Sequence, residues 1–125
     1  MIDHLDHLVL TTIDEAACVR FYTEVLGMRH VRQDRGRQAF HFGHQKINLH
    51  LRGREFEPKA HLPVPGALDL CFIASVPLEA VIERLKQHGV PILEGPVERT
   101  GAVGTIRSVY VRDPDLNLIE ISELA

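Results

Sequence analysis

The chain repeats one arrangement of residues in its two halves. Each half begins and ends with a short run of alternating or continuous apolar residues. After the first of these runs, apolar residues recur at helical spacing up to a glycine. The four runs, in chain order, are Leu5–Leu10, Ile47–Leu51, Leu68–Ile73 and Asn117–Ile121. Self-similarity of this kind predicts a duplicated supersecondary unit. Superimposing the copies places His7 opposite Leu70 and His50 opposite Glu120.

The first half reads as strand, helix and three further strands. Asp14 is suited to cap a helix by accepting backbone N–H bonds, and Gly27 is suited to the left-handed residue that ends it. The apolar stripe of this helix is Cys18, Phe21, Tyr22 and Val25. Extended segments are expected at 28–33 and 38–42, joined by a turn at 34–36, before the closing strand.

The second half repeats this order. Pro77 stands where the first turn of a helix tolerates proline, and Gly89 ends the helical pattern. The helical apolar stripe is Leu78, Val81, Ile82 and Leu85. The remaining strands are expected at 90–93, 106–111 and 118–121, and the loops at 95–104 and 113–115.

The predicted fold class is α+β, with two tandem βαβββ modules in one domain spanning residues 1–125. The modules cover about 4–53 and 67–125, and a proline-containing linker, 54–66, joins them. A unit of this order places its helix on one side of its sheet. The other side is then free to curve around a cavity, so we expect a mixed sheet in the shape of a cup.

Composition favours a small-molecule partner. The formal charge is −3 and basic residues are scattered among acids, which argues against nucleic-acid binding. No basic leader and no run of eighteen apolar residues is present, so we expect a cytoplasmic protein that does not bind membranes. Cys18 and Cys71 both lie in apolar stretches, and we expect two buried free thiols.

Strand alternation points to a metal site. In the run 47–51, His50 lies on the face opposite Ile47 and Leu49, and in the last run Glu120 lies opposite its apolar neighbours. If Leu8 and Leu10 pack under the helix, His7 lies on the cup face as well. Two imidazoles and one carboxylate suit a divalent Fe, Mn, Co, Ni or Zn ion and leave positions open for water and substrate.

The alternative is that these side chains hold no metal. His7 and His50 would then be cavity histidines with ordinary hydrogen bonds, and Glu120 would pair with an arginine such as Arg52, Arg107 or Arg112. His41 and Tyr110 occupy corresponding third strands and should also face the cup. His41 could act as an acid or base and Tyr110 as a hydrogen-bond donor, or both could simply line the cavity.

Several motifs together resemble the vicinal oxygen chelate superfamily. They are the strand His7–Leu10 leading into Phe21–Met28, and the ending Asp113–Ile121. This superfamily includes glyoxalase I, fosfomycin-resistance thiol transferases, extradiol dioxygenases and bleomycin-resistance proteins. The stretch Lys46–Lys59 is similar to small glyoxalase-domain-containing proteins.

The resemblance implies a glyoxalase-like fold and a divalent metal held by residues of the first and last strands of each module. The matching residues are His7, His50 and Glu120, while Leu70 stands where many members have a histidine. In glyoxalase I-like enzymes four protein ligands hold the metal, so Leu70 implies the loss of one ligand unless Asp69 turns inward. The alternation of side chains along the strand argues against such a turn of Asp69. Leu116 replaces a glycine that commonly precedes Asn in the last turn.

The leading functional hypothesis is therefore a metal-dependent enzyme acting on a small oxygenated substrate, either a glyoxalase-like lyase or isomerase or a dioxygenase. The alternative is a metal-free protein that sequesters a ligand, as bleomycin-resistance members do. The resemblance also implies a homodimer whose cups are each completed by two chains. Nothing favours a nucleotide cofactor.

Overall fold

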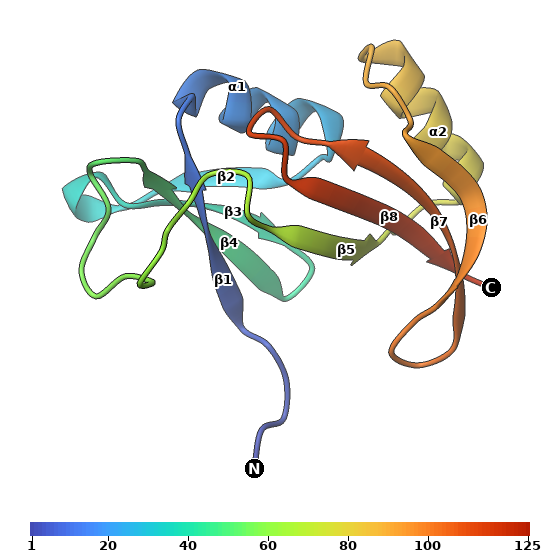
Figure 1. The fold of residues 1–125 in the computed structure, drawn as a ribbon, viewed down its shortest axis with the longest axis horizontal. Helices are drawn as coiled ribbons and strands as arrows, with labels where there is room; N and C mark the ends of the chain where they lie inside the picture. Colours follow the sequence, from blue (N-terminus) through green and yellow to red (C-terminus); the bar gives the residue numbers. More distant parts are fainter. The chain divides into compact units, whose positions relative to one another are not determined.

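The computed structural model describes residues 1–125, which form two compact units, Met1–Ala67 and Leu68–Ala125. Each unit contains a four-stranded mixed sheet and follows the order strand, helix, three strands (Figure 1). The predicted α+β class with two βαβββ repeats is confirmed. No helix is long and apolar enough to cross a membrane.

The first unit has the strand order β1-β4-β3-β2, with β1 parallel to β4 and the other pairs antiparallel. Its strands are β1 (His7–Thr12), β2 (Arg29–Arg32), β3 (Gln38–Phe42) and β4 (Gln45–Leu51). Its helical segments are α1 (Glu15–Arg20), a π-helical continuation (Phe21–Val25) and a 3-10 turn (Asp34–Gly36).

The second unit has the corresponding order β5-β8-β7-β6, with β5 parallel to β8. Its elements are β5 (Asp69–Ile73), α2 (Leu78–Gln87), β6 (Glu94–Thr100), β7 (Thr105–Arg112) and β8 (Leu118–Leu124). Residues 54–66, predicted as a linker, contain no helix or strand.

Local chemistry explains where the helices begin and end. Asp14 caps α1 as predicted, because its Oδ1 accepts a hydrogen bond from the Ala17 N–H at 3.1 Å. Gly27 has a φ of 75°, the left-handed conformation expected after the helix. Pro77 is the residue before α2 and has no side-chain oxygen to offer. The carboxylate of Glu123 instead accepts a hydrogen bond from the Leu78 N–H at 2.7 Å.

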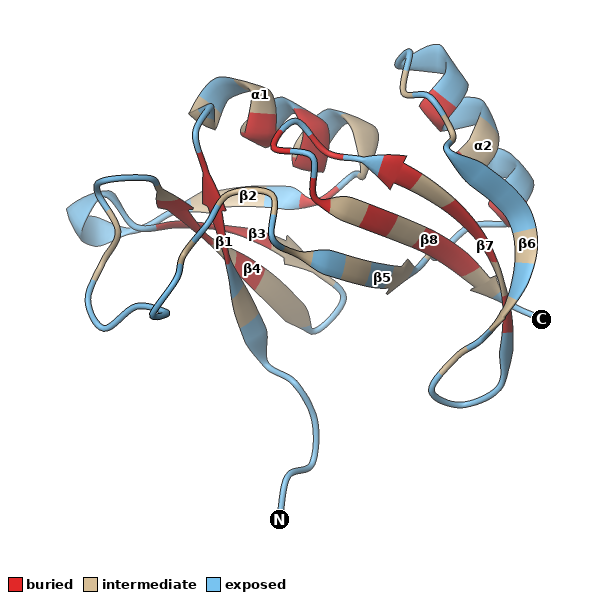
Figure 2. Ribbon diagram, in the orientation of Figure 1, coloured by how far each residue is buried: buried red, intermediate tan, exposed pale blue.

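In the first unit, an apolar core joins α1 and its π-helical continuation to the sheet. The Tyr22 ring stacks on Phe40 with 5.2 Å between ring centroids, and both side chains are fully buried. Other buried members of this core are Leu10, Cys18, Phe21, Ile47 and Leu49. Figure 2 shows buried positions on the helix and along the strands beneath it.

The core of the second unit is built in the same way. Leu78, Val81 and Leu85 of α2 are buried, and α2 contacts β7 and β8. The buried side chains of these two strands are Val109, Val111, Ile119 and Ile121. Burial of alternate residues identifies the sheet face that meets each helix, and the opposite face of the same sheet is called its helix-free face below.

The prediction of a strand at 90–93 was wrong, because the structure has its strand at Glu94–Thr100, which except for Glu94 falls in the predicted loop 95–104. Pro91 has no N–H for a sheet hydrogen bond, whereas β6 is an edge strand that tolerates Pro96 at a register shift. Gly95 makes this edge possible. Its φ is 104°, and a Cβ there would lie only 2.3 Å from the Ser108 carbonyl oxygen.

The expectation of two buried thiols was half wrong. Cys18 is buried, whereas Cys71 is exposed on β5. Partial burial of the Cys71 thiol still raises its pKa above the ordinary value. The thiol is therefore protonated at neutral pH.

Candidate functional site on the helix-free sheet faces

In the first unit, Leu8 and Leu10 pair with Ile47 and Leu49 across β1 and β4. Since Ile47 and Leu49 are buried in the core, the residues between them belong to the helix-free face. That face carries His7, Val9 and Thr11 on β1, Lys46, Asn48 and His50 on β4, and Ala39 and His41 on β3. It is rich in imidazole, amide and hydroxyl groups.

The parallel register does not bring His7 and His50 side by side. His7 pairs with Lys46 and His50 pairs with Thr11, so the two histidines lie four residues apart along the strands. At about 3.3 Å per residue this offset is about 13 Å. Asn48 is the closer neighbour of His7, at a diagonal position two residues from Lys46.

The register of the second unit corrects the predicted role of Leu70. Leu70 pairs with the buried Ile119 and so belongs to the helix face, whereas Asp69 and Cys71 share the helix-free face with Glu120. Alternation within β5 alone had suggested the reverse. Asp69 therefore has, in the second unit, the register position that His7 has in the first. By the same comparison, the residue of the first unit that corresponds to Glu120 is Asn48 and not His50.

His7 is half-exposed and has a carboxylate beside it. Its Nδ1 lies 2.8 Å from Asp6 Oδ1, and this hydrogen bond lowers the pKa of Asp6 below its ordinary value. Because an ionised carboxylate only accepts, Nδ1 carries a hydrogen, which leaves Nε2 as the nitrogen that could offer a lone pair. Histidines that bind a metal commonly donate their other ring N–H to a carboxylate in this way, which fixes the orientation of the ring.

Glu120 is held by the fully buried Ser108, which in turn contacts the fully buried Ser122. The Ser108 hydroxyl donates to Glu120 Oε2 at 2.6 Å, and the Ser108 and Ser122 hydroxyl oxygens lie 2.7 Å apart. Since Ser108 gives its one hydrogen to the carboxylate, it accepts the hydrogen of Ser122. The predicted alternative of an Arg107–Glu120 pair is not observed, because Arg107 pairs with Glu79 and Glu123 on the helix face.

His41 and Tyr110, the predicted polar residues of the third strands, both lie on helix-free faces. His41 Nε2 is buried without a hydrogen-bond partner. Tyr110 pairs with Glu120 across β7 and β8, and its hydroxyl oxygen accepts a hydrogen bond from Arg99 Nε at 3.0 Å. Arg99 in turn pairs with Glu94, so the Tyr110 hydroxyl is held in place and its own hydrogen is left to donate.

His50 is 7% exposed, and its Nδ1 is buried without a hydrogen-bond partner. Burial is the largest cause that lowers the pKa of this imidazole, and the positive charge of Arg37 lowers it further. The negative charge of Glu55 opposes both effects. His50 is therefore neutral at neutral pH.

This neutrality predicts a loss of stability in acid. As the pH falls below the ordinary value of 6.5, the unfolded chain takes up a proton at His50 before the folded chain does, so the free energy of unfolding decreases. His50→Gln removes this contribution. Urea unfolding at about pH 7 and about pH 5 should show a smaller acid loss in His50→Gln than in the parent or in the exposed-site control His61→Gln. An equal loss in all three proteins would contradict the prediction.

The donor chemistry of His7 and Glu120 fits a divalent metal. His7 has an oriented ring whose Nε2 could offer a lone pair, and Glu120 has lone pairs beyond the one that Ser108 uses. Within either unit, however, no three His, Cys, Asp or Glu side chains gather closely enough to hold an ion. His50 does not join His7, for the register reason given above.

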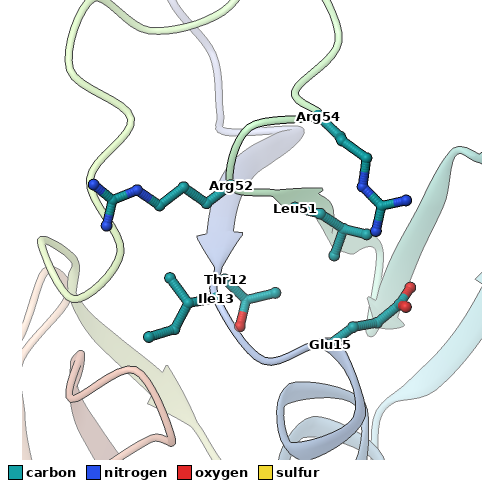
Figure 3. A pocket seen from close by; sticks show the side chains of 6 residues that line it. All are labelled: Thr12, Ile13, Glu15, Leu51, Arg52 and Arg54. Atoms are coloured by element: carbon teal, nitrogen blue, oxygen red, sulfur yellow. The ribbon is translucent and has the colours of Figure 1, made fainter.

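A separate cavity of about 250 Å³ opens at the ends of β1 and β4. Its lining residues are Thr12, Ile13, Glu15, Leu51, Arg52 and Arg54 (Figure 3). The Arg52 side chain extends to one side, whereas Arg54 and Glu15 lie on the other. Arg52, a candidate partner of Glu120 in the sequence, lines this cavity, and Gln38 already donates a hydrogen bond to Glu15 at 2.6 Å.

Comparison with known proteins shows the family. Residues 4–121 match the family described as Glyoxalase/Bleomycin resistance protein/Dioxygenase superfamily. The chain is 57% identical over 123 residues to virulence protein STM3117 of Salmonella typhimurium, covering 98% of this chain and 85% of that protein. It is 55% identical over 118 residues to the glyoxalase domain-containing protein RDO1 of Mycosarcoma maydis, covering 94% of this chain and 66% of that protein.

Solved structures agree with this assignment. The crystal structure of STM3117 matches with a TM-score of 0.97 at 56% identity, covering 100% of this chain and 99% of that one. Lactoylglutathione lyase from Agrobacterium tumefaciens (TM-score 0.73, 24% identity) and the antibiotic binding protein TnmS3 from Streptomyces (0.76, 21%) share the fold. The chain thus belongs to the glyoxalase/bleomycin resistance/dioxygenase superfamily, the vicinal oxygen chelate group that its sequence motifs resemble.

Proposed function

We propose that the protein is a metal-dependent enzyme of the vicinal oxygen chelate type that acts on a small oxygenated substrate. The reaction is that of a glyoxalase-like lyase or isomerase, or of a dioxygenase. Superfamily membership across residues 4–121 supports the proposal. The observation that carries it is the pair of prepared ligands on helix-free faces, His7 oriented by Asp6 and Glu120 oriented by Ser108.

The proposed residues have distinct roles. His7 and Glu120 bind the divalent ion, which when bound would hold adjacent oxygens of a substrate and stabilise negative charge on them. His41 is the proposed acid or base, because its ring has a buried nitrogen with no partner. Tyr110 is the proposed donor to a substrate oxygen, since Arg99 holds its hydroxyl oxygen in place. His50 was expected as a third ligand, but its distance from His7 along the sheet favours a different role.

Elemental analysis after exposure to Mn²⁺, Fe²⁺, Co²⁺, Ni²⁺ or Zn²⁺ and dialysis tests the metal proposal. We expect about one ion per chain in the parent and a loss of at least about tenfold in affinity in His7→Ala and in Glu120→Gln, because each removes one of few protein ligands. The control is His61→Ala, which removes an exposed histidine of the segment 54–66 and should leave the metal content unchanged. Equal metal in all four proteins, or none in the parent, would exclude the proposed site.

A metal-free ligand-binding protein of the bleomycin-resistance type is the second candidate. The observation that favours it is that neither unit gathers three metal-ligating side chains. Under this proposal the parent holds no ion, and protein treated with EDTA binds its ligand as tightly as protein supplied with metal. A small molecule that raises the unfolding temperature equally with and without EDTA would identify a metal-free ligand-binding protein.

We also propose that the protein is a homodimer, as superfamily members often are, with His7 and Glu120 of one metal site supplied by different subunits. Exposed apolar side chains along the edge strands β1 and β5, including Val9 and Ile73, support an association between chains. In the same metal assay, co-refolded His7→Ala and Glu120→Gln chains should recover part of the parent's metal. No recovery would place both ligands of a site in one chain.

A further inference from the structure

In the first unit, three side chains from different segments form a cluster outside the proposed metal ligands. The antiparallel pair of Gln38 with Leu49 continues by one residue to put Arg37 opposite His50. Phe56, from the segment 54–66, contacts both: its ring centroid lies 5.7 Å from that of His50 and 4.3 Å from the Arg37 guanidinium carbon. This group is called the His50 cluster below.

The two nitrogens of His50 have different surroundings. Nδ1 is buried and unpaired, whereas Nε2 makes no hydrogen bond but reaches the surface. A neutral imidazole has one N–H and one lone pair, and a buried N–H without an acceptor is rarer in folded proteins than an unpaired acceptor. The lone pair therefore belongs on Nδ1 and the hydrogen on Nε2. This tautomer presents an N–H donor at the surface. Metal binding through Nε2 would require the hydrogen to move to the buried Nδ1, which has no acceptor.

Arg37 supplies a second set of donors. Its guanidinium is exposed, stacks over Phe56, and makes no hydrogen bond or ion pair. The negative charge of Glu55 acts on His50, and the Glu55 carboxylate already accepts a hydrogen bond from the Gly53 N–H at 3.1 Å. The cluster thus combines unpaired N–H donors, a positive charge and an aromatic wall.

We propose that the His50 cluster binds a carboxylate group of the ligand, with His50 Nε2–H and the Arg37 guanidinium as donors and Phe56 as the apolar wall. This proposal rests on the proposed function, because the carboxylate is part of the small oxygenated substrate proposed there. It assigns His50 to substrate recognition rather than to the metal. Planar donors on Arg match carboxylate oxygens well, and a charge-assisted pair is stronger than a neutral hydrogen bond.

The first test determines the tautomer of His50 and requires neither a bound metal nor an activity assay. Long-range ¹H–¹⁵N spectra of histidine-labelled protein in EDTA at neutral pH should show His50 with its hydrogen on Nε2, and the signals are assigned by their loss in His50→Gln. A hydrogen on Nδ1, or a doubly protonated ring, would overturn the proposal. Either result leaves the proposed metal ligands His7 and Glu120 untouched.

Binding is tested with pyruvate, a carboxylate next to a carbonyl, and with acetone as the uncharged match, both in EDTA. Pyruvate should shift the His50 and Phe56 ring signals to saturation, and acetone should not. Arg37→Gln and His50→Leu should each weaken pyruvate binding by about tenfold or more. The control Arg32→Gln removes another exposed arginine of the same sheet and should bind as the parent does.

The outcomes separate this proposal from the metal function. Absence of pyruvate binding, or equal binding by Arg37→Gln and the parent, would exclude a carboxylate site at the His50 cluster. Retained metal in His50→Leu together with lost pyruvate binding supports both proposals. Lost metal in His50→Leu would return His50 to the ligand set and overturn the tautomer argument.

Discussion

Replacing Phe40 by alanine should lower the free energy of unfolding by about 3–5 kcal/mol, among the largest effects expected for a single substitution in this chain. The ring is fully buried at the centre of the first unit's core. Its ring centroid lies 5.2 Å from that of Tyr22, on which it stacks, and 5.5 Å from that of His30. The substitution therefore removes aromatic contacts as well as buried apolar area. Urea unfolding followed by circular dichroism measures the change.

Two variants test the cavity explanation for Phe40. Phe40→Leu keeps much of the side-chain volume and should lose less stability than Phe40→Ala. Leu62→Ala removes a side chain that is 72% exposed and should change stability by no more than about 0.5 kcal/mol. A loss below about 1.5 kcal/mol in Phe40→Ala would mean that the site collapses around the smaller residue.

Asp113→Ala should cost about 3 kcal/mol or more, because one buried carboxylate organises the turn between β7 and β8. Asp113 is 3% exposed. Its Oδ1 accepts hydrogen bonds from the N–H groups of Asp115 and Asn117, both at 2.9 Å, and Oδ2 accepts one from Asn117 Nδ2 at 2.8 Å. Hydrogen bonds to a charged group contribute about 1.5–3 kcal/mol each, and their removal leaves buried donors unpaired. Thermal and urea unfolding check the value.

Replacing Asn117, the hydrogen-bond partner of Asp113, should lower the stability as well. Asn117→Ala loses the bond to Asp113 and also the bond that Asn117 Oδ1 accepts from the Leu68 N–H at 2.8 Å, so a comparable loss is expected. Asp34→Ala removes an exposed carboxylate in another turn and should be nearly neutral. Similar stability of Asp113→Ala and Asp34→Ala would show that water replaces the buried bonds.

The local features of this fold could be predicted because they depend on neighbouring residues. Asp14 caps its helix and Gly27 adopts a positive φ, as their side chains dictate. Leu116, the departure from the usual glycine, adopts a φ of 70° and is 66% exposed, so it occupies a left-handed turn position that glycine favours. These residues required no knowledge of distant segments.

Strand β6 and the cap of α2 depend on distant segments and were missed. Glu94–Thr100 is a polar stretch with Gly95 and Pro96, and it becomes a strand because β7 supplies the partner for its hydrogen bonds. The Leu78 N–H is satisfied by Glu123, a residue 45 positions away. Ser108 shares strand parity with Tyr110, and this was the one sequence signal that could have revealed its bond to Glu120.

The sequence was sufficient to predict the duplicated α+β fold, the superfamily and the polar face of β4 and β8, because a strand's alternation reports which side chains share a face. Which of these side chains are neighbours could be established only from the folded chain. It separated His7 from His50 by four residues and put Asp69, instead of Leu70, on the face of Glu120. This follows from register, because the offset between paired strands is set by long-range packing and a shift of one residue moves every side chain to the opposite face.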